Sequence, residues 1–343
     1  MPVKVGEAKL LKDPEALSIL ILSIVLAIIP LTLLQKPYTL WIIIITIFYV
    51  VLAINWNLLL GYMKLLSFAH TGLIGIGGYG SALFIASTGL PPLIGLLVGT
   101  TLAAVTGLVL GWACLRLRGI YLALTTWGFS GSLQLLLLSE YNITGGSKGI
   151  HTKFLLPVTS FEAPQYYYYI ALTLLILCMM TTYKLIHSKY GLYLRAMGDD
   201  EDAAAACGVN IIRLRIFIFT ISSLWVGAAG AFYVHFLGYA SPAIADFSTI
   251  MITVLGSTIL GGLGTFFGPI LGTFIIWPLS EVIRARSASL QMIILAAVIL
   301  LSLKFFTNGF VGAVSSLYHK YKDEIEEAIS RLKSLLIHHT VLA

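Results

Sequence analysis

Residues 38–62 read YTLWIIIITIFYVVLAINWNLLLGY, a run without a single charged side chain. A transmembrane α-helix needs about 20 consecutive, mostly apolar residues. This run therefore predicts a helix that crosses a membrane, and nine comparable runs occur elsewhere in the chain. They lie at about residues 16–34, 66–87, 92–115, 119–139, 166–186, 214–237, 247–263, 267–283 and 288–305.

The composition of the whole chain supports the same fold class. Of the 343 residues, 58% are hydrophobic and 10% are charged, and the mean hydropathy is +0.95. Soluble domains carry about 25% charged residues, so an ordinary soluble enzyme and a disordered protein are excluded. The net charge of +6 comes without a dense basic stretch, which argues against a partner nucleic acid. We expect an all-α integral membrane protein, a polytopic bundle of about ten transmembrane helices, some of them short or broken.

The basic residues predict an orientation. With the N-terminus in the cytoplasm, 16 of the 21 Lys and Arg residues fall on the inner side, in accord with the positive-inside rule. The five on the outer side are Lys36, Lys148, Lys153, Arg284 and Arg286. Both termini are therefore expected in the cytoplasm. The last two arginines are discordant, so re-entrant segments are an alternative to full spans for the eighth and ninth helices.

The chain divides into three segments on this interpretation. Residues 1–15 form a cytoplasmic N-terminal segment, 16–305 a transmembrane domain, and 306–343 a cytoplasmic tail. Apolar residues recur in the tail at steps of three and four, which predicts an amphipathic helix on the membrane surface or on a cytosolic partner. They are Leu317, Tyr321, Ile325, Ala328, Leu332 and Leu335.

Cysteine and histidine positions give no sign of metal binding or catalysis. The three cysteines, Cys114, Cys178 and Cys207, form no CxxC pair, and the sequence contains no HExxH. The P-loop pattern GxxxxGK[ST] is also missing, so ATP is not expected to bind this chain. We expect no metal, no bound cofactor and no catalytic residue.

Glycine clusters lie in both halves of the chain. The members are Gly72, Gly75, Gly77, Gly78 and Gly80 in the first half, and Gly256, Gly261, Gly262, Gly264, Gly268 and Gly272 in the second. Tight helix packing is one interpretation, because small residues let helices approach closely. The other is a broken helix in each half, a pattern typical of inverted repeats.

The longest hydrophilic segment between the runs, residues 187–213, predicts a short helix. Four consecutive acidic residues at 199–202 precede four alanines at 203–206. Acidic residues stabilise a helix N-terminus, alanine favours helix, and Gly208 can end it. Such a helix in a cytoplasmic loop indicates a docking element, and a solvated loop with one helical turn is the alternative.

The sequence DAAAACG at 202–208 resembles the EAA-x-x-x-G motif of ABC importer permeases, with Asp in place of Glu. The flanking YGLYLRAMGDDEDAA and the later GGLGTFFGPILGTF are similar to the branched-chain amino-acid permeases of LivM type. So are NLLLGY at 57–62, LRLRGIYLAL at 115–124 and TGGSKGI at 144–150. The similarity covers about residues 50–305, with the motifs in family order.

This resemblance implies the permease subunit of an ATP-driven importer of branched-chain (aliphatic) amino acids in the inner membrane of a prokaryote. The implied partners are two ATP-binding cassette subunits that carry ATP and Mg, a second homologous permease subunit and an extracytoplasmic substrate-binding protein. Transport would proceed by alternating access. The implied coupling element towards the ATPase consists of Asp202, Ala203, Ala204 and Gly208.

One segment departs from the family pattern. The family commonly shows Gly-Gln-Leu-Ser-Leu-Gly-His where residues 64–70 read KLLSFAH. Ser67 and His70 are kept, whereas Lys64, Leu65 and Ala69 replace the Gly, the Gln and the second Gly. A lost amide and a gained cation leave the substrate open, so urea, another amide or another small metabolite is the alternative.

Polar side chains in or beside the runs line a permeation path or form interhelical hydrogen bonds. The candidates for the path are Asn55, Asn57, Gly61, Ser67, His70, Thr125, Thr126 and Ser130. Candidates at the outer face, where substrate or a delivery protein would arrive, are Thr144, Gly145, Gly146 and Ser147. A plain surface turn is the alternative for the second group.

Two further classes of protein are compatible with parts of the sequence. An ion-coupled carrier normally has charged residues inside its spans, whereas Glu140, Asp246 and Glu281 lie at or near span ends. An intramembrane serine protease is the third class, because GFSG surrounds Ser130 and His235 lies in another run. That chemistry requires a base within hydrogen-bond reach of the serine.

Overall fold

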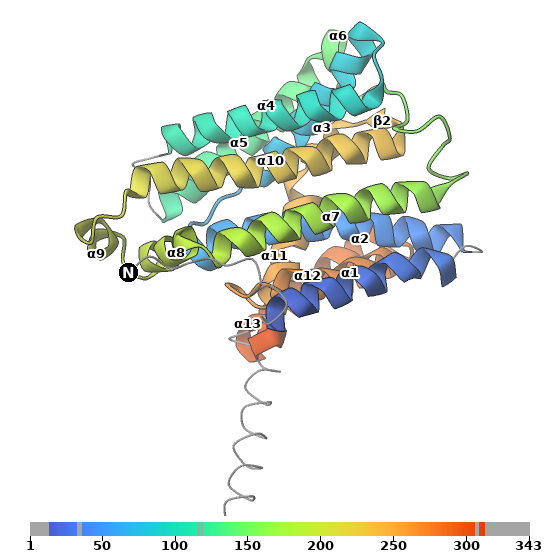
Figure 1. Ribbon diagram of the computed structural model, residues 1–343. Helices are drawn as coiled ribbons and strands as arrows, with labels where there is room; N and C mark the ends of the chain where they lie inside the picture. Colours follow the sequence, from blue (N-terminus) through green and yellow to red (C-terminus); the bar gives the residue numbers. More distant parts are fainter. Residues whose placement is uncertain (1–13, 33–35, 115–116, 118, 306–308, 313–343) are drawn as a thin grey trace, which may run out of the picture.

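The computed structural model describes residues 14–32, 36–114, 117, 119–305 and 309–312, which are almost entirely helical (Figure 1). Residues 1–13 of the predicted N-terminal segment lie outside the described residues. So do all the apolar positions of the predicted tail helix.

Each predicted apolar run contains a helix. The ten helices are α1 (Pro14–Thr32), α2 (Pro37–Asn57), α3 (His70–Thr88), α4 (Pro92–Ala113), α5 (Ile120–Ser139), α7 (Pro164–Ile186), α10 (Ile211–Leu237), α11 (Ile252–Gly261), α12 (Gly268–Arg284) and α13 (Ala288–Phe305). Proline is the first residue of α2, α4 and α7, where its fixed φ suits a helix and its missing N–H costs nothing.

Length and hydropathy distinguish several of these helices. Five segments of the described chain are long and apolar enough to cross a membrane, namely 37–62, 92–113, 120–139, 164–186 and 211–237. Shorter apolar helices occur at Leu17–Pro30, Phe247–Gly261 and Ser289–Ser302. The structure is therefore mostly helical, with five long apolar helices and several shorter ones.

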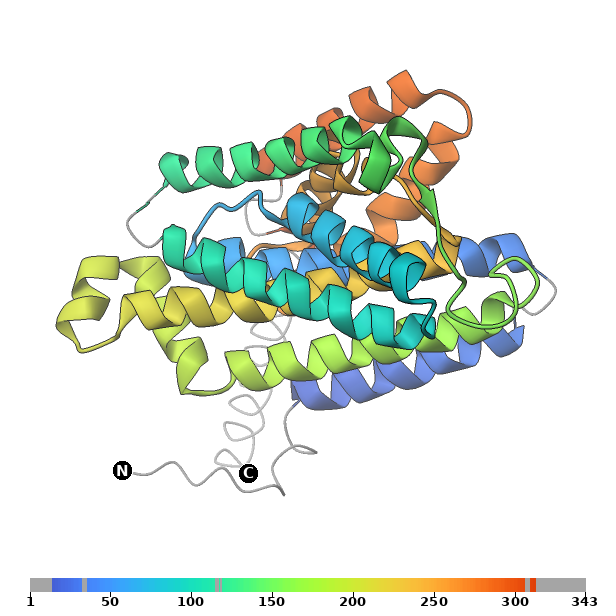
Figure 2. The ribbon, with the colours of Figure 1, turned by 90° about the horizontal axis from the view of Figure 1, so that it is seen from above.

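Two helical hairpins pack against two long helices. The hairpin of α3 and α4 packs against α10, and the hairpin of α11 and α12 packs against α2. Figure 1 shows α3, α4, α5 and α10 in one layer and α1, α2, α7 and α12 in the other, and Figure 2 shows the same bundle from above, with α5 and α1 on opposite sides of α10. The core lies between the layers and is densest along α2, whose residues from Ile44 to Asn57 are all buried.

Glycines bring these helices into backbone contact. A Cβ on Gly77 of α3 would lie 2.6 Å from Gly227 Cα of α10, and a Cβ on Gly99 of α4 would meet Gly77 O. In the second hairpin, a Cβ on Gly272 would meet Ser257 O. The packing interpretation of both glycine clusters therefore holds.

The third apolar run begins differently from its prediction. A π-helical segment, η2 (Leu58–Tyr62), continues α2, and α3 begins only at His70. Residues 64–69 are not helical, and Lys64 has a φ of 54°. Ser67, expected in or beside a helix at 66–87, therefore lies in a break between two helices.

The ends of the bundle carry the remaining elements. At one end are α8 (Lys189–Asp199) and α9 (Glu201–Ala206), which join α7 to α10. The opposite end of α10 leads into β2 (Tyr239–Ala240), which pairs antiparallel with β1 (Ile150–His151). Beside this ribbon lie α6 (Tyr141–Thr144) and η3 (Gly146–Lys148), with η4 (Pro242–Ala245) and η5 (Phe247–Met251) leading into α11.

Candidate functional site

The short helix predicted from the acidic and alanine run is present as α9. The Asp200 carboxylate caps it by accepting hydrogen bonds from Asp202 N and Ala203 N, both at 2.9 Å. Such a cap satisfies N–H groups that have no partner within the helix. Gly208 follows the helix with a φ of 86°, a conformation that glycine adopts without strain.

The predicted coupling residues divide by exposure. Asp202, Ala203 and Gly208 are exposed on α9 and its end, whereas Ala204 is buried. Ala204 therefore faces the bundle, and the others face outward. The exposed part of α9 is small and free of bulky side chains.

Ion pairs between described residues connect this end to the rest of the bundle. Arg215 of α10 lies 2.7 Å from Glu201 of α9, and its side chain is 3% exposed. Lys64, in the break after α2, pairs with Asp199 at 2.9 Å. Both partners of the second pair are largely exposed, so it contributes little stability.

The preceding helix α8 was not predicted. Ser188 is its N-cap residue, and the Ser188 hydroxyl accepts a hydrogen bond from Tyr190 N. Its buried residues, Gly191, Leu194 and Met197, recur every three residues. The serine cap and this spacing are the sequence signals that identify it.

Two of the predicted path residues form hydrogen bonds with the non-helical segment before α3. Phe68 N donates to Thr126 Oγ1 at 2.9 Å, and Ser130 Oγ donates to Phe68 O at 2.8 Å. Thr126 and Ser130 are four residues apart on α5, so they lie on one face. The two hydroxyls thus supply hydrogen-bond partners for Phe68 N and Phe68 O, which would be paired with other backbone groups if this segment were helical. Trp56 Nε1 also donates to Ser67 O at 2.8 Å.

Asn57 fixes the tip of the α11–α12 hairpin. Its Nδ2 donates to Thr265 O, and its Oδ1 accepts from Gly264 N, both at 2.9 Å. Gly61 packs on the same tip, because a Cβ there would lie 2.5 Å from Gly264 N. Both residues thus contact the tip of this hairpin.

Asn55 and His70 form a third cluster with Ser222 of α10. Ser222 Oγ lies 3.2 Å from His70 Nε2 and donates to Asn55 O at 3.3 Å. Asn55 Nδ2 reaches Val51 O and Cys178 Sγ. Asn55 Oδ1 and His70 Nδ1 are buried without a hydrogen-bond partner among the described residues.

These predicted path residues thus make hydrogen bonds or close contacts between elements of the bundle. Thr125 stands apart from all of them. Its side chain is exposed on the surface of the bundle, and its hydroxyl donates to Tyr121 O of the same helix.

The outer-face candidates form a tight turn. Thr144 Oγ1 donates to Leu137 O and Glu140 O, and Gly145 and Gly146 have φ values of 74° and 55°. The Tyr239 hydroxyl donates to Lys148 O, next to the β1–β2 ribbon. Of the four candidates, Ser147 is the exposed one, and the turn itself is fixed to the end of α10.

The serine protease arrangement is not formed. The Ser130 hydroxyl donates to a backbone carbonyl. His235 uses both ring nitrogens elsewhere: Nε2 lies 2.7 Å from Ser81 Oγ, and Nδ1 lies 2.8 Å from Lys153 O. The described residues contain no group of three or more His, Cys, Asp or Glu side chains that could hold a metal ion.

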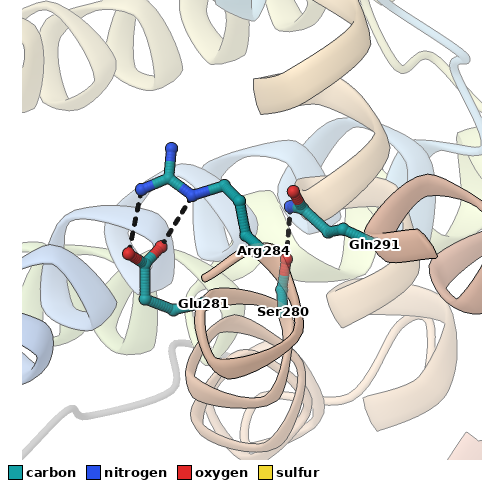
Figure 3. Close-up of polar contacts among 4 residues, drawn as sticks. All are labelled: Ser280, Glu281, Arg284 and Gln291. Carbon is teal, nitrogen blue, oxygen red and sulfur yellow. Dashed lines mark hydrogen bonds and ion pairs between the residues drawn. The ribbon is translucent and has the colours of Figure 1, made fainter. Parts of the chain in front are cut away.

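Sequence reasoning missed a cavity of about 310 Å³ at the β1–β2 end. It lies where α2, α10 and α12 meet the loop before α11. Its lining includes Tyr49, Tyr233, Asp246, Trp277 and Arg284. Figure 3 shows the Arg284 guanidinium bound through two nitrogens to Glu281, at 2.9 and 3.1 Å. It also shows Gln291 of α13, which donates to Ser280 at 2.6 Å.

Comparison with known proteins identifies relatives over most of the chain. A family model described as branched-chain amino acid transport system / permease component matches residues 38–303. The high-affinity branched-chain amino acid transport system permease protein LivM of Escherichia coli (strain K12) is 29% identical over 265 residues. The LivM protein of Salmonella typhimurium is 31% identical over 269 residues.

Each of these two alignments covers 70% of this chain and 62% of the relative. The chain thus spans less than two thirds of the length of these relatives. A shorter match joins it to the ribose import permease protein RbsC of Escherichia coli (strain K12), 32% identical over 35% of this chain and 39% of that protein. No solved structure matches.

Proposed function

The chain belongs to the family of branched-chain amino acid transport system permease components, and we propose that it is the membrane-spanning subunit of an ATP-driven importer of branched-chain amino acids. The observation that carries this proposal is α9. It is a capped helix, anchored by the Glu201–Arg215 pair, that presents a small exposed surface at one end of the bundle. In the proposed complex this surface docks into the ATP-binding subunit.

The proposed mechanism is alternating access. ATP closes two partner ATPase subunits, residues 195–212 move with them, and the bundle opens to the other side. An extracytoplasmic binding protein delivers the substrate, and a second homologous permease subunit completes the membrane unit. ATP and Mg bind the ATPase subunits rather than this chain.

We further propose ten membrane crossings in two inverted halves, with both termini in the cytoplasm. The packing of α3–α4 against α10 and of α11–α12 against α2 supports the two halves. The distribution of Lys and Arg supports the orientation. In this arrangement α8 and α9 face the cytoplasm, and the β1–β2 ribbon faces the outside of a prokaryotic inner membrane.

The substrate is the finer part of the proposal. Two relatives named for branched-chain amino acids match 70% of the chain, whereas the ribose permease matches 35%. Inhibition of leucine uptake by urea, acetamide or ribose would indicate that the substrate is another small metabolite rather than a branched-chain amino acid. Loss of uptake on collapse of the proton gradient, with ATP held constant, would favour an ion-coupled carrier.

The first experiment is gentle extraction of the tagged chain from native membranes, with identification of co-purifying proteins by mass. Recovery of ATP-binding subunits and a second permease is expected. Gly208→Pro should lose the ATP-binding subunits while the chain stays in the membrane, because proline cannot adopt the positive φ that ends α9. Recovery of the folded chain alone, or uptake by the variant equal to the unmodified chain, would refute the proposal.

A further inference from the structure

Six of the fifteen residues that line the cavity at the β1–β2 end are aromatic. Tyr49 of α2 stacks on Trp277 of α12 with ring centroids 4.2 Å apart, and Phe48 stacks on Tyr233 of α10 at 4.6 Å. All four residues line the cavity. Its volume of about 310 Å³ lies within the range of small-molecule pockets, about 300–1,000 Å³.

Hydrogen-bonding groups in this wall have no partner in the described part of the chain. Tyr49 is 5% exposed, and its hydroxyl makes no hydrogen bond there. The indole N–H groups of Trp41 and Trp277 are also without a partner, but protein atoms cover them. Buried polar groups are normally hydrogen-bonded, so the Tyr49 hydroxyl is the group of this wall that suits a ligand with an acceptor.

Charges of both signs lie on the same cavity. Asp246 accepts hydrogen bonds from Thr249 N and Gln134 Nε2, but it forms no ion pair with a described residue. Arg284 binds Glu281 through Nε and Nη2, and its other terminal nitrogen points away from that carboxylate (Figure 3). Asp246 immediately precedes η5 and α11, and Arg284 is the last residue of α12.

We propose that this cavity binds a small zwitterion of the α-amino-acid type, inside one permease subunit and at its outer end. The ammonium group lies at Asp246 and against the aromatic faces, which attract cations. The carboxylate accepts from Arg284, a residue type suited to carboxylates. The aliphatic part fills the space beside Ile45 and Ile250, which complete the wall. The inference rests on the proposed function for the direction of entry and for the choice of amino acid.

Substituted cysteines in the full chain test this assignment in intact cells. Ser241→Cys and Ala243→Cys place thiols in the cavity wall, and a membrane-impermeant maleimide reports their access. Ser87→Cys is the matched control, because Ser87 is exposed at the same end, close to Gly89, whose carbonyl accepts from Lys153 Nζ, and lies outside the cavity lining. L-Leucine should slow labelling at 241 and 243 but not at 87.

Two leucine fragments and one variant test the two charges. 3-Methylbutylamine lacks the carboxylate and 4-methylpentanoate lacks the ammonium group, so both should protect at least about tenfold less well than leucine. Asp246→Asn should raise the half-protecting leucine concentration about tenfold or more, because a charge-assisted hydrogen bond is lost. Equal protection by the amine alone, or no effect of Asp246→Asn, would overturn the zwitterion site.

Leucine uptake in the same cells separates this inference from the proposed function. Uptake with no protection at 241 or 243, or with equal slowing at all three positions, overturns the cavity site and leaves the importer standing. Protection without uptake overturns the importer and leaves the site standing. Thiols at 241 and 243 that never react from outside would overturn the proposed entry.

Discussion

Arg215 Nη2 lies 2.7 Å from Glu201 Oε2, and this ion pair joins the short helix α9 to the long helix α10. The arginine side chain is 3% exposed, whereas Lys64 and Asp199, the other pair at this end, are 62% and 76% exposed. Removing one partner from a buried ion pair is more destabilising than removing one from an exposed pair. The Glu201–Arg215 pair therefore fixes the position of α9.

Glu201→Gln should weaken coupling between α9 and the bundle. The change removes the charge of one partner from a pair whose arginine is buried, which costs about 3 kcal/mol at most because Glu201 itself is partly exposed. ATP-dependent leucine uptake should fall at least about tenfold, with the chain still in the membrane. The control is Asp199→Asn, which breaks the exposed pair and should leave uptake within about twofold. Equal effects of the two variants would contradict this account.

Asn57→Ala should lower stability without changing substrate preference. The variant removes both hydrogen bonds to the hairpin tip at Gly264 and Thr265, each worth about 1–3 kcal/mol when a buried group is left unpaired. A lower unfolding temperature of the detergent-solubilised chain is expected. Asn142→Ala, at an exposed position in α6, serves as the control. An altered ratio of leucine to urea uptake, with normal stability, would instead place Asn57 in the permeation path.

Thr126→Val and Thr125→Val should differ although the two residues are adjacent. The first leaves Phe68 N without its acceptor and should cost about 1–3 kcal/mol. The second removes only a bond to the same helix at an exposed position and should stay within about 0.5 kcal/mol. Thermal unfolding of the solubilised chain measures both. Similar unfolding temperatures for the two variants would show that the conformation of the non-helical segment before α3 does not depend on its hydrogen bond to Thr126 of α5.

Gly77→Ala should destabilise the bundle, whereas Gly128→Ala should not. A Cβ on Gly77 would press on the Gly227 backbone of α10, which cannot move alone, while a Cβ on Gly128 meets nothing within 4 Å. At the open position the helix gains up to about 1 kcal/mol from alanine. The yield of folded, monodisperse chain after extraction should fall only for Gly77→Ala.

Cys207 should report the orientation of the coupling end. It is exposed next to α9, whereas Cys114 and Cys178 are buried. A membrane-impermeant maleimide should leave the unmodified chain unlabelled in intact cells and label it after permeabilisation. Labelling of Cys207 in intact cells would invert the proposed topology.

The positions of the helices were largely predictable, because hydropathy records which residues are buried or face lipid. All ten apolar runs contain helices, mostly within about two residues of the predicted bounds. The start of α3 at His70 was not predictable, because the non-helical segment before it depends on Thr126 and Ser130, about 60 residues later. Local hydropathy contains no information on such distant partners.

The candidate site was predictable only in part. The short helix α9 follows from its own acids and alanines, because capping and propensity are local. The use of Asn57 in a hairpin tip and the exposure of Thr125 depend on how helices face one another. The cavity was missed because Asp246 and Arg284 are distant in sequence, and only the hairpin between them brings both to one end.

The hydrogen bonds of Asn57 to the hairpin tip also have a consequence for the insertion of the protein into the membrane. The segment 247–261 is shorter than a usual membrane-crossing helix, so it is a poor candidate for insertion as an isolated helix. Ribosomes synthesise α2 long before they synthesise this hairpin. The surface of α2 on which the hairpin packs is therefore already in the membrane when the hairpin is made. Late insertion of 247–284 onto a finished α2 is thus the expected biogenesis, and a truncated chain without α2 should leave this hairpin outside the bilayer.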